Sequence, residues 1–188
     1  MTIHLSTLVA YVVLVLTEIV LNRTRGSKAT DKQGADKKSV TFIWITIPFA
    51  IFFAVYLANY LPLPIYANPS GQYIGVALIA LGILLRLLAI YTLGQYFTVD
   101  VTIRPNHRIK TDGLYKYLRH PSYAASLLSF IGMGISFNNW LSLGLLTGSV
   151  LVVFINRIRV EEAVLIEHFG AEYIAYKKVT SGLIPFIY

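Results

Sequence analysis

Long apolar runs separated by short polar segments make up most of this chain. Five runs approach the ~20 residues that a helix needs to cross a lipid bilayer. They occupy residues 3–21, 40–61, 73–93, 121–137 and 140–156. The pattern therefore predicts an all-α integral membrane protein with five transmembrane helices.

The ends of these runs refine the prediction. No charged segment precedes the first run and no A-x-A cleavage site follows it, so we expect a retained anchor rather than a signal peptide. Asn138 and Asn139 separate the last two runs and predict a tight helical hairpin. Because no helix breaker follows residue 148 until Gly170, the fifth helix should project beyond the bilayer. A short helix over residues 171–178 should follow.

Positive charge is confined to alternate connections. Of the 16 Lys and Arg residues, 15 lie in residues 23–38, 104–119 and 157–178. The connector 62–72 has none, and neither does the Asn138-Asn139 turn. Five crossings place the three basic segments on one side of the membrane. The positive-inside rule then predicts an outside N-terminus and a cytosolic C-terminus, in the plasma membrane if the source is a prokaryote.

Composition supports a membrane protein and excludes several chemistries. The 188 residues are 56% hydrophobic and 13% charged, whereas soluble domains carry about 25% charged residues. We expect a single domain over residues 1–188. The absence of cysteine excludes disulfides and thiolate chemistry, and the spacing of the histidines does not suit a metal site. The net charge of +7 indicates anionic lipid headgroups as partners rather than nucleic acid.

Two features inside the apolar runs concern helix packing. Arg86 lies within L-L-R-L-L, and Glu18 lies near the same membrane face of the first run. We expect them to pair, or Arg86 to extend to the interface, with a ligand contact as the alternative. The G-x-x-x-G motifs at 71–75 and 144–148 should allow close helix approach.

Candidate chemistry gathers around residues 107–123 and along the fifth helix. Pro121 should open a helix whose first-turn N–H groups suit an anion. Arg157 and Glu161 are four residues apart and therefore share a helix face. The alternatives are a basic interfacial loop with a belt of tyrosines, and a simple ion pair on a solvated helix worth ~0.3–0.5 kcal/mol.

Three stretches resemble the isoprenylcysteine carboxyl methyltransferase family. They are G-L-Y-K-Y-L-R-H-P-S-Y at 113–123, E-E-A-V-L-I-E-H-F-G-A-E-Y-I-A-Y-K-K at 161–178 and G-L-I-P-F at 182–186. The motif-bearing part covers residues 94–188, and the short chain is similar to compact prokaryotic members. The same boxes also resemble phospholipid N-methyltransferases.

The resemblance implies a cytosolic C-terminal cofactor pocket carried by membrane helices. It implies methyl transfer from S-adenosylmethionine to the α-carboxylate of a C-terminal S-isoprenylcysteine, a lipid-linked substrate. Arg157 would bind the substrate, and Arg157 and Glu161 would be the catalytic residues. The implied cofactor contacts are His107, Arg108, Ile109, Lys110, Tyr115, His120, Pro121, Ser122, Tyr123 and Glu161.

Two alternatives remain at this stage. One is methyl transfer to a lipid amine, which requires a base to remove the amine proton, whereas a carboxylate requires an arginine such as Arg157. The other is a non-enzymatic membrane scaffold or small transporter, in which the basic loops serve only the orientation of the chain.

Single cysteines introduced into this cysteine-free chain test the predicted orientation. In intact cells, Lys110→Cys and Lys178→Cys should both resist a membrane-impermeant thiol reagent, because both positions are expected in the cytosol. Permeabilisation should make both reactive. Labelling of one position but not the other in intact cells would contradict the predicted topology.

Overall fold

The computed structural model describes residues 5–24, 32–33, 37–99, 102–103 and 107–184. Within them the helices are α1 (Leu5–Thr24), α2 (Lys37–Tyr60), α3 (Gln72–Leu93), α4 (Pro121–Ser136), α5 (Trp140–Phe169) and α6 (Ala171–Val179). The 3₁₀ turns are η1 (Pro69–Gly71), η2 (Gly94–Tyr96) and η3 (Gly113–Lys116). A small antiparallel ladder, absent from the prediction, pairs β1 (Lys32–Gln33) with β2 (Thr102–Ile103).

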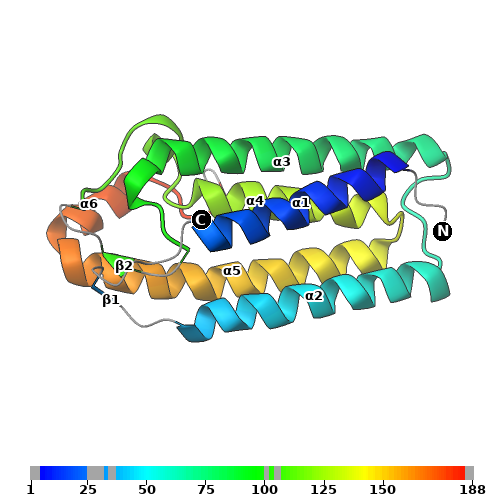
Figure 1. Ribbon diagram of the computed structural model, residues 1–188, viewed down its shortest axis with the longest axis horizontal. Helices are drawn as coiled ribbons and strands as arrows, with labels where there is room; N and C mark the ends of the chain where they lie inside the picture. The colour runs from blue at the N-terminus through cyan, green and yellow to red at the C-terminus, as the bar shows by residue number, and fades with distance from the viewer. Residues whose placement is uncertain (1–4, 25–31, 34–36, 100–101, 104–106, 185–188) are drawn as a thin grey trace.

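The five long helices run side by side along the long axis of the molecule (Figure 1). α1 packs on α3, α2 packs on α5, and α4 packs between α3 and α5. The outer faces of α1, α2 and α3 expose large apolar side chains, as lipid contact requires. The coarser part of the predicted fold class, an all-helical protein with helices apolar enough to cross a membrane, is thus confirmed.

Four of these helices have the length and apolar composition of a membrane span. The candidate spans cover residues 5–24, 39–60, 69–96 and 140–169, and the third joins η1 and η2 to α3. α4 has 16 residues, which is about 24 Å of helix and shorter than the ~30 Å apolar core of a bilayer. The five predicted helices all form, and a fifth crossing through α4 stays a prediction.

Close backbone contact between α3 and α4 holds the centre of the bundle. A Cβ atom on Gly75 would lie 2.5 Å from Gly132 O, so only hydrogen fits there. The helix approach predicted at 71–75 is therefore confirmed for Gly75. It is wrong for 144–148, because nothing in the described residues lies within 4 Å of a Cβ built on Gly144 or Gly148.

The turn between α4 and α5 is fixed to the connector between α2 and α3. Asn138 adopts a left-handed backbone (φ 53°), which asparagine tolerates better than most residues. Its side-chain oxygen accepts hydrogen bonds from the N–H groups of Ile65 and Tyr66, each at 2.9 Å. Asn139 donates to Leu61 O at 2.6 Å. The predicted helical hairpin is confirmed.

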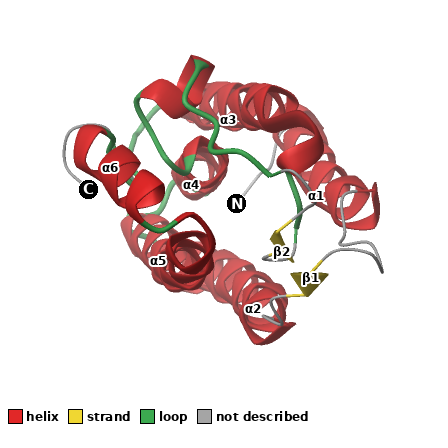
Figure 2. Cartoon of the chain, turned by 90° about the vertical axis from the view of Figure 1, so that its left-hand side faces the viewer, coloured by secondary structure: helices red, strands yellow, loops and turns green. Residues whose placement is uncertain are grey.

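At the opposite end, α5 extends past its neighbours and ends where predicted. Gly170 follows α5 with φ 56°, and α6 turns back across the end of the bundle (Figure 1). The loop after α3, the start of α4, the end of α5 and α6 gather there, as the view down the bundle shows (Figure 2). This end is where the predicted site residues lie.

Gly75→Ala should destabilise the fold by ~1–3 kcal/mol, because its methyl group would collide with the backbone of α4. Thermal unfolding in detergent measures the effect. Gly144→Ala is the matched control: it has open space around the new methyl group and gains helix propensity. Equal midpoints for the two variants would contradict the α3–α4 contact.

Candidate active site

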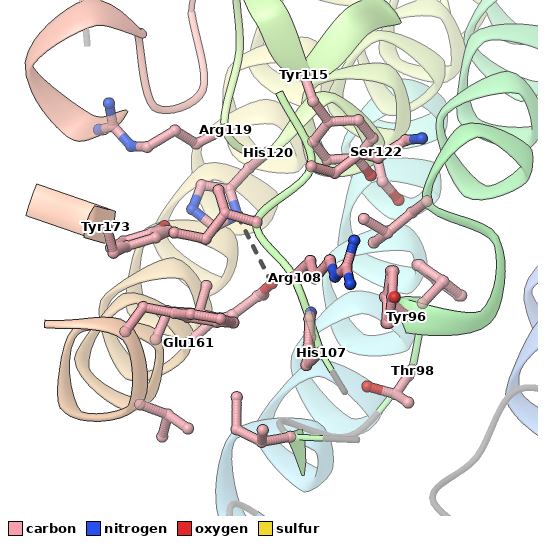
Figure 3. A pocket seen from close by; sticks show the side chains of 18 of the residues that line it. Tyr96, Thr98, His107, Arg108, Tyr115, Arg119, His120, Ser122, Glu161 and Tyr173 are labelled. Atoms are coloured by element: carbon pink, nitrogen blue, oxygen red, sulfur yellow. Dashed lines mark ion pairs between the residues drawn. The ribbon is translucent and has the colours of Figure 1, made fainter. Parts of the chain in front are cut away.

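A polar pocket opens at the end of the bundle where α6 lies (Figure 3). Its empty space, which includes a part open to solvent, is about 880 Å³. The pocket is built from residues 93–98, 102–103 and 107–110, together with η3, the start of α4, the end of α5 and α6. Its lining includes the predicted residues His107, Arg108, Ile109, Lys110, Tyr115, His120, Ser122, Tyr123, Arg157 and Glu161. Pro121, also predicted, is buried at the start of α4 and is not part of the lining.

Arg157 is buried at the base of this pocket, with 2% of its surface exposed. Its guanidinium donates to the Ser39 hydroxyl at 2.5 Å, to Val99 O and to the Tyr123 hydroxyl at 3.4 Å. The Tyr123 hydroxyl in turn donates to Glu161 at 2.9 Å. The alternative of a simple ion pair on a solvated helix is therefore wrong, because Arg157 is not solvated and Tyr123 links it to Glu161.

Glu162, next to Glu161, has a different role that the sequence analysis missed. Its carboxylate binds Arg119 Nε at 2.7 Å, His120 Nε2 at 3.3 Å and Lys177 Nζ at 2.5 Å. These partners come from the R-H-P box and from α6. Glu162 therefore joins α5 to both segments. The signal was present as the second acid of the E-E pair and the arginine of R-H-P, but their pairing spans 43 residues.

The segment after α6 completes the support of this end. Arg119 N–H donates to Ser181 O at 2.9 Å, and His120 N–H donates to Gly182 O at 3.1 Å. Leu183 is buried in the helix bundle. The backbone at the start of the box at 182–186 thus fixes the R-H-P box through hydrogen bonds. Its last two residues lie outside the described residues.

Aromatic rings form one wall of the pocket. Tyr96 stacks on His107 with ring centroids 4.8 Å apart, and Phe169 meets His107 edge-on. Burial raises the pKa of the Tyr115 phenol, which keeps its hydroxyl neutral as a donor to Ala89 O. Such a wall suits a flat heterocycle.

Charged groups surround the rest of the space. Arg108 and Lys110 line it from the loop, and Figure 3 shows Arg108 extending between His107 and Ser122. Glu161 approaches His120 Nδ1 at 3.9 Å. This set suits a ligand that carries both signs of charge.

The first turn of α4 offers fewer backbone N–H groups to an anion than the sequence predicts. Pro121 has no N–H group. The N–H groups of Tyr123 and Ala124 donate to His120 O, each at 3.1 Å. The charged side chains around the pocket, rather than this turn, offer the larger number of groups to a ligand.

A second cavity lies deeper in the bundle and is mainly apolar. It is bounded by α1, α2, α4 and α5, with Arg86 of α3 at its side. Its wall includes the predicted pair: Arg86 binds Glu18 at 2.8 Å and donates to the Ser122 hydroxyl at 3.0 Å. The two cavities share a wall made of Phe97, Thr98, Ser122, Tyr123 and Arg157. Fold and site define a helical protein of the membrane type, with a polar pocket beside an apolar cavity.

Comparisons with known proteins agree with this class. The sequence model of the isoprenylcysteine carboxyl methyltransferase (ICMT) family matches residues 75–167. Protein-S-isoprenylcysteine O-methyltransferase B of Arabidopsis thaliana is 31% identical over an alignment of 162 residues that covers 82% of this chain and 82% of the Arabidopsis protein. This chain belongs to the isoprenylcysteine carboxyl methyltransferase family. The predicted family and enzyme class, a carboxyl methyltransferase, are confirmed.

Two further matches extend the comparison. The Saccharomyces cerevisiae protein-S-isoprenylcysteine O-methyltransferase is 39% identical over 116 residues, 61% of this chain and 48% of the yeast protein. The structure of a eukaryotic intramembrane Ras methyltransferase ICMT superposes with a TM-score of 0.63 and 25% identity. The match covers 96% of this chain and 63% of that one, so the chain spans somewhat less than two thirds of the length of the eukaryotic structure.

Glu162→Ala should lower the stability of the protein by about 3 kcal/mol, because it leaves Arg119 without its carboxylate partner in a mostly buried position. Thermal unfolding in detergent measures this loss. Glu172→Ala, on the exposed face of α6, should leave the midpoint within a degree or two. Equal unfolding midpoints for Glu162→Ala and Glu172→Ala would contradict the proposal that Glu162 joins α5 to the R-H-P box and to α6.

Proposed function

We propose that this chain transfers the methyl group of S-adenosylmethionine to the α-carboxylate of a C-terminal S-isoprenylcysteine and forms a methyl ester. The observation that carries the proposal is the position of Arg157, which lines both the polar pocket and the apolar cavity. A guanidinium there can bind a carboxylate whose lipid tail lies on one side while the methyl donor lies on the other.

The polar pocket matches the chemistry of the proposed donor. The aromatic wall of Tyr96, His107 and Phe169 suits an adenine ring. Arg108 and Lys110 suit the carboxylate of the amino-acid part, and Glu161 suits its ammonium group. S-adenosylmethionine would supply an electrophilic methyl carbon on its sulfonium. The charges that surround the pocket are those that this zwitterionic, cationic molecule requires.

The acceptor chemistry needs alignment rather than a base. A carboxylate is ionised at neutral pH, so an acceptor oxygen can form the new C–O bond as the S–CH₃ bond breaks and its electron pair stays on sulfur. Arg157 would hold both carboxylate oxygens in one plane. Tyr123, bonded to Arg157 and Glu161, would keep the guanidinium in place. The rate would come mainly from proximity and orientation.

The apolar cavity gives the isoprenoid tail a place within the membrane. Leu14 and Leu21 of α1 and Ile43 and Ile47 of α2 face it, and α1 and α2 each pack on other helices. The tail would therefore enter sideways from lipid between α1 and α2. We further propose that α4 completes five crossings, which places the polar pocket on the cytosolic side.

A lipid amine is the weaker candidate for the acceptor. Arg157 at the shared wall would repel a protonated amine, and such an acceptor also needs a base to become nucleophilic. The proposal is tested with purified protein, S-adenosylmethionine and two acceptors, N-acetyl-farnesylcysteine and phosphatidylethanolamine. We expect a methyl ester on the first and no transfer to the second. Transfer to the amine alone, or no calorimetric binding of S-adenosylmethionine, would refute it.

Arg157→Ala should lower kcat/KM for N-acetyl-farnesylcysteine by at least ~100-fold, equivalent to about 2.7 kcal/mol, because the acceptor loses its charged partner. The Kd for S-adenosylmethionine should stay within threefold. Arg159→Ala, an exposed arginine on the same helix, should change neither value. A collapse of cofactor affinity in Arg157→Ala would give Arg157 a different role.

A further inference from the structure

Arg157 is bound by a residue that lies outside all three boxes that resemble the family. Ser39, the third residue of α2, accepts a hydrogen bond from Arg157 Nη1 at 2.5 Å. Both residues are buried, so bulk water does not compete for this bond. A hydrogen bond donated by a charged group is roughly twice as strong as one between neutral groups. The Ser39 hydroxyl is therefore a strong constraint on the guanidinium.

The hydrogen bonds of Arg157 hold different nitrogens of its planar guanidinium. Nη1 donates to Ser39 of α2, and Nη2 donates to Val99 O in the loop after α3. Nε donates to the Tyr123 hydroxyl over the longer distance of 3.4 Å. A plane that is held at several atoms, from several segments, has a fixed orientation. Loss of the Ser39 bond would release Nη1 on the α2 side and let the plane turn about the bonds that remain.

Ser39 lies next to the two binding spaces without lining either of them. The linings of the polar pocket and the apolar cavity both include Arg157, and that of the apolar cavity includes Val40, but neither includes Ser39. A ligand in either space is thus separated from Ser39 by other side chains. Apart from an effect on the fold, an effect of Ser39 on the reaction must pass through Arg157.

The chemical nature of the Ser39 side chain suits this position. A hydroxyl oxygen accepts a hydrogen bond without carrying a negative charge. A carboxylate in its place would form an ion pair with Arg157 and compete with the carboxylate of an acceptor. Serine therefore orients the guanidinium and adds no competing charge.

We propose that Ser39 is a positioning residue that orients the Arg157 guanidinium toward the acceptor carboxylate. This inference rests on the proposed function, because it assumes that Arg157 binds that carboxylate. Methyl transfer requires an acceptor oxygen in line with the S–CH₃ bond, and a misplacement of about 1 Å can lower the rate ~100-fold. A turned guanidinium would still attract the carboxylate but would hold it at the wrong angle. Loss of the Ser39 hydroxyl should therefore lower kcat more than it raises KM.

The first test is Ser39→Ala with N-acetyl-farnesylcysteine as the acceptor. The kcat, counted per S-adenosylmethionine-binding site measured by calorimetry, should fall at least tenfold. The KM for the acceptor should rise less than threefold, and the Kd for S-adenosylmethionine should stay within threefold. Counting per binding site removes any loss of folded protein from the comparison.

Ser142→Ala is the matched control for the packing of α2 on α5. The buried Ser142 hydroxyl of α5 donates to Ala54 O of α2 at 2.6 Å, so it joins the same two helices near their other end. Both variants remove one hydrogen bond between α2 and α5, but Ser142 is remote from the shared wall. Ser142→Ala should keep the wild-type kcat per binding site.

Three further substitutions at Ser39 separate the hydroxyl from its neutral charge. Ser39→Thr retains a hydroxyl and should recover most of the kcat that Ser39→Ala loses. Ser39→Asp and Ser39→Asn introduce side chains of nearly equal size that differ in charge. The KM for the acceptor should be at least tenfold higher in Ser39→Asp than in Ser39→Asn, because the new carboxylate competes for Arg157.

The positioning role is overturned by a wild-type kcat in Ser39→Ala, by an equal loss in Ser142→Ala, or by a Ser39→Thr variant no more active than Ser39→Ala. Equal KM values for Ser39→Asp and Ser39→Asn would overturn the need for a neutral side chain. Transfer by the wild-type protein together with an unchanged Ser39→Ala refutes this role alone. No transfer by the wild-type protein refutes the proposed function, and this role with it.

Discussion

The rest of this structure depends on a guanidinium buried where a polar pocket meets an apolar cavity. Arg157 cannot rely on water there, so protein groups must accept its hydrogen bonds. Ser39 supplies one from the start of α2, Val99 one from the loop after α3, and Tyr123 one from the first turn of α4. The hydrogen bonds of Arg157 thus hold three separate segments together, and those segments contribute to the wall that the two cavities share.

A second constraint, the ion pairs of Glu162, holds the segments that form the pocket together. Two adjacent glutamates on α5 bind different partners: Glu161 binds Tyr123, and Glu162 binds Arg119 and Lys177. Glu162 is mostly buried and has three cationic or potentially cationic partners, so its ion pairs are less screened than those at a surface. The same short stretch of α5 therefore supplies Glu161 to the pocket lining and Glu162 to the ion pairs that fix the pocket's walls.

The course of the helices could be predicted from the sequence because apolar runs and breakers are local signals. Gly170 and the Asn138-Asn139 turn are examples, and both are where the pattern indicated. The boxes around 113–123 and 161–178 also hold half of the residues that line the pocket. What could not be predicted depends on pairs distant in sequence: Ser39 with Arg157 is separated by 118 residues, and Tyr11 with Ser136 by 125. The G-x-x-x-G motif misled at 144–148 because small residues permit a helix contact without requiring one.

The proposed reaction explains why these two constraints occur together. Its two reactants need different solvents, since the methyl donor is a charged, water-soluble molecule and the acceptor tail is a hydrocarbon. Reaction requires their atoms to meet within about 3–3.5 Å, so the two binding spaces must share a wall. That wall must carry a positive charge for the carboxylate and still exclude bulk water. A buried arginine that is hydrogen-bonded to the protein meets both needs. The ion pairs of Glu162 hold the donor side of the wall at a fixed position relative to this arginine.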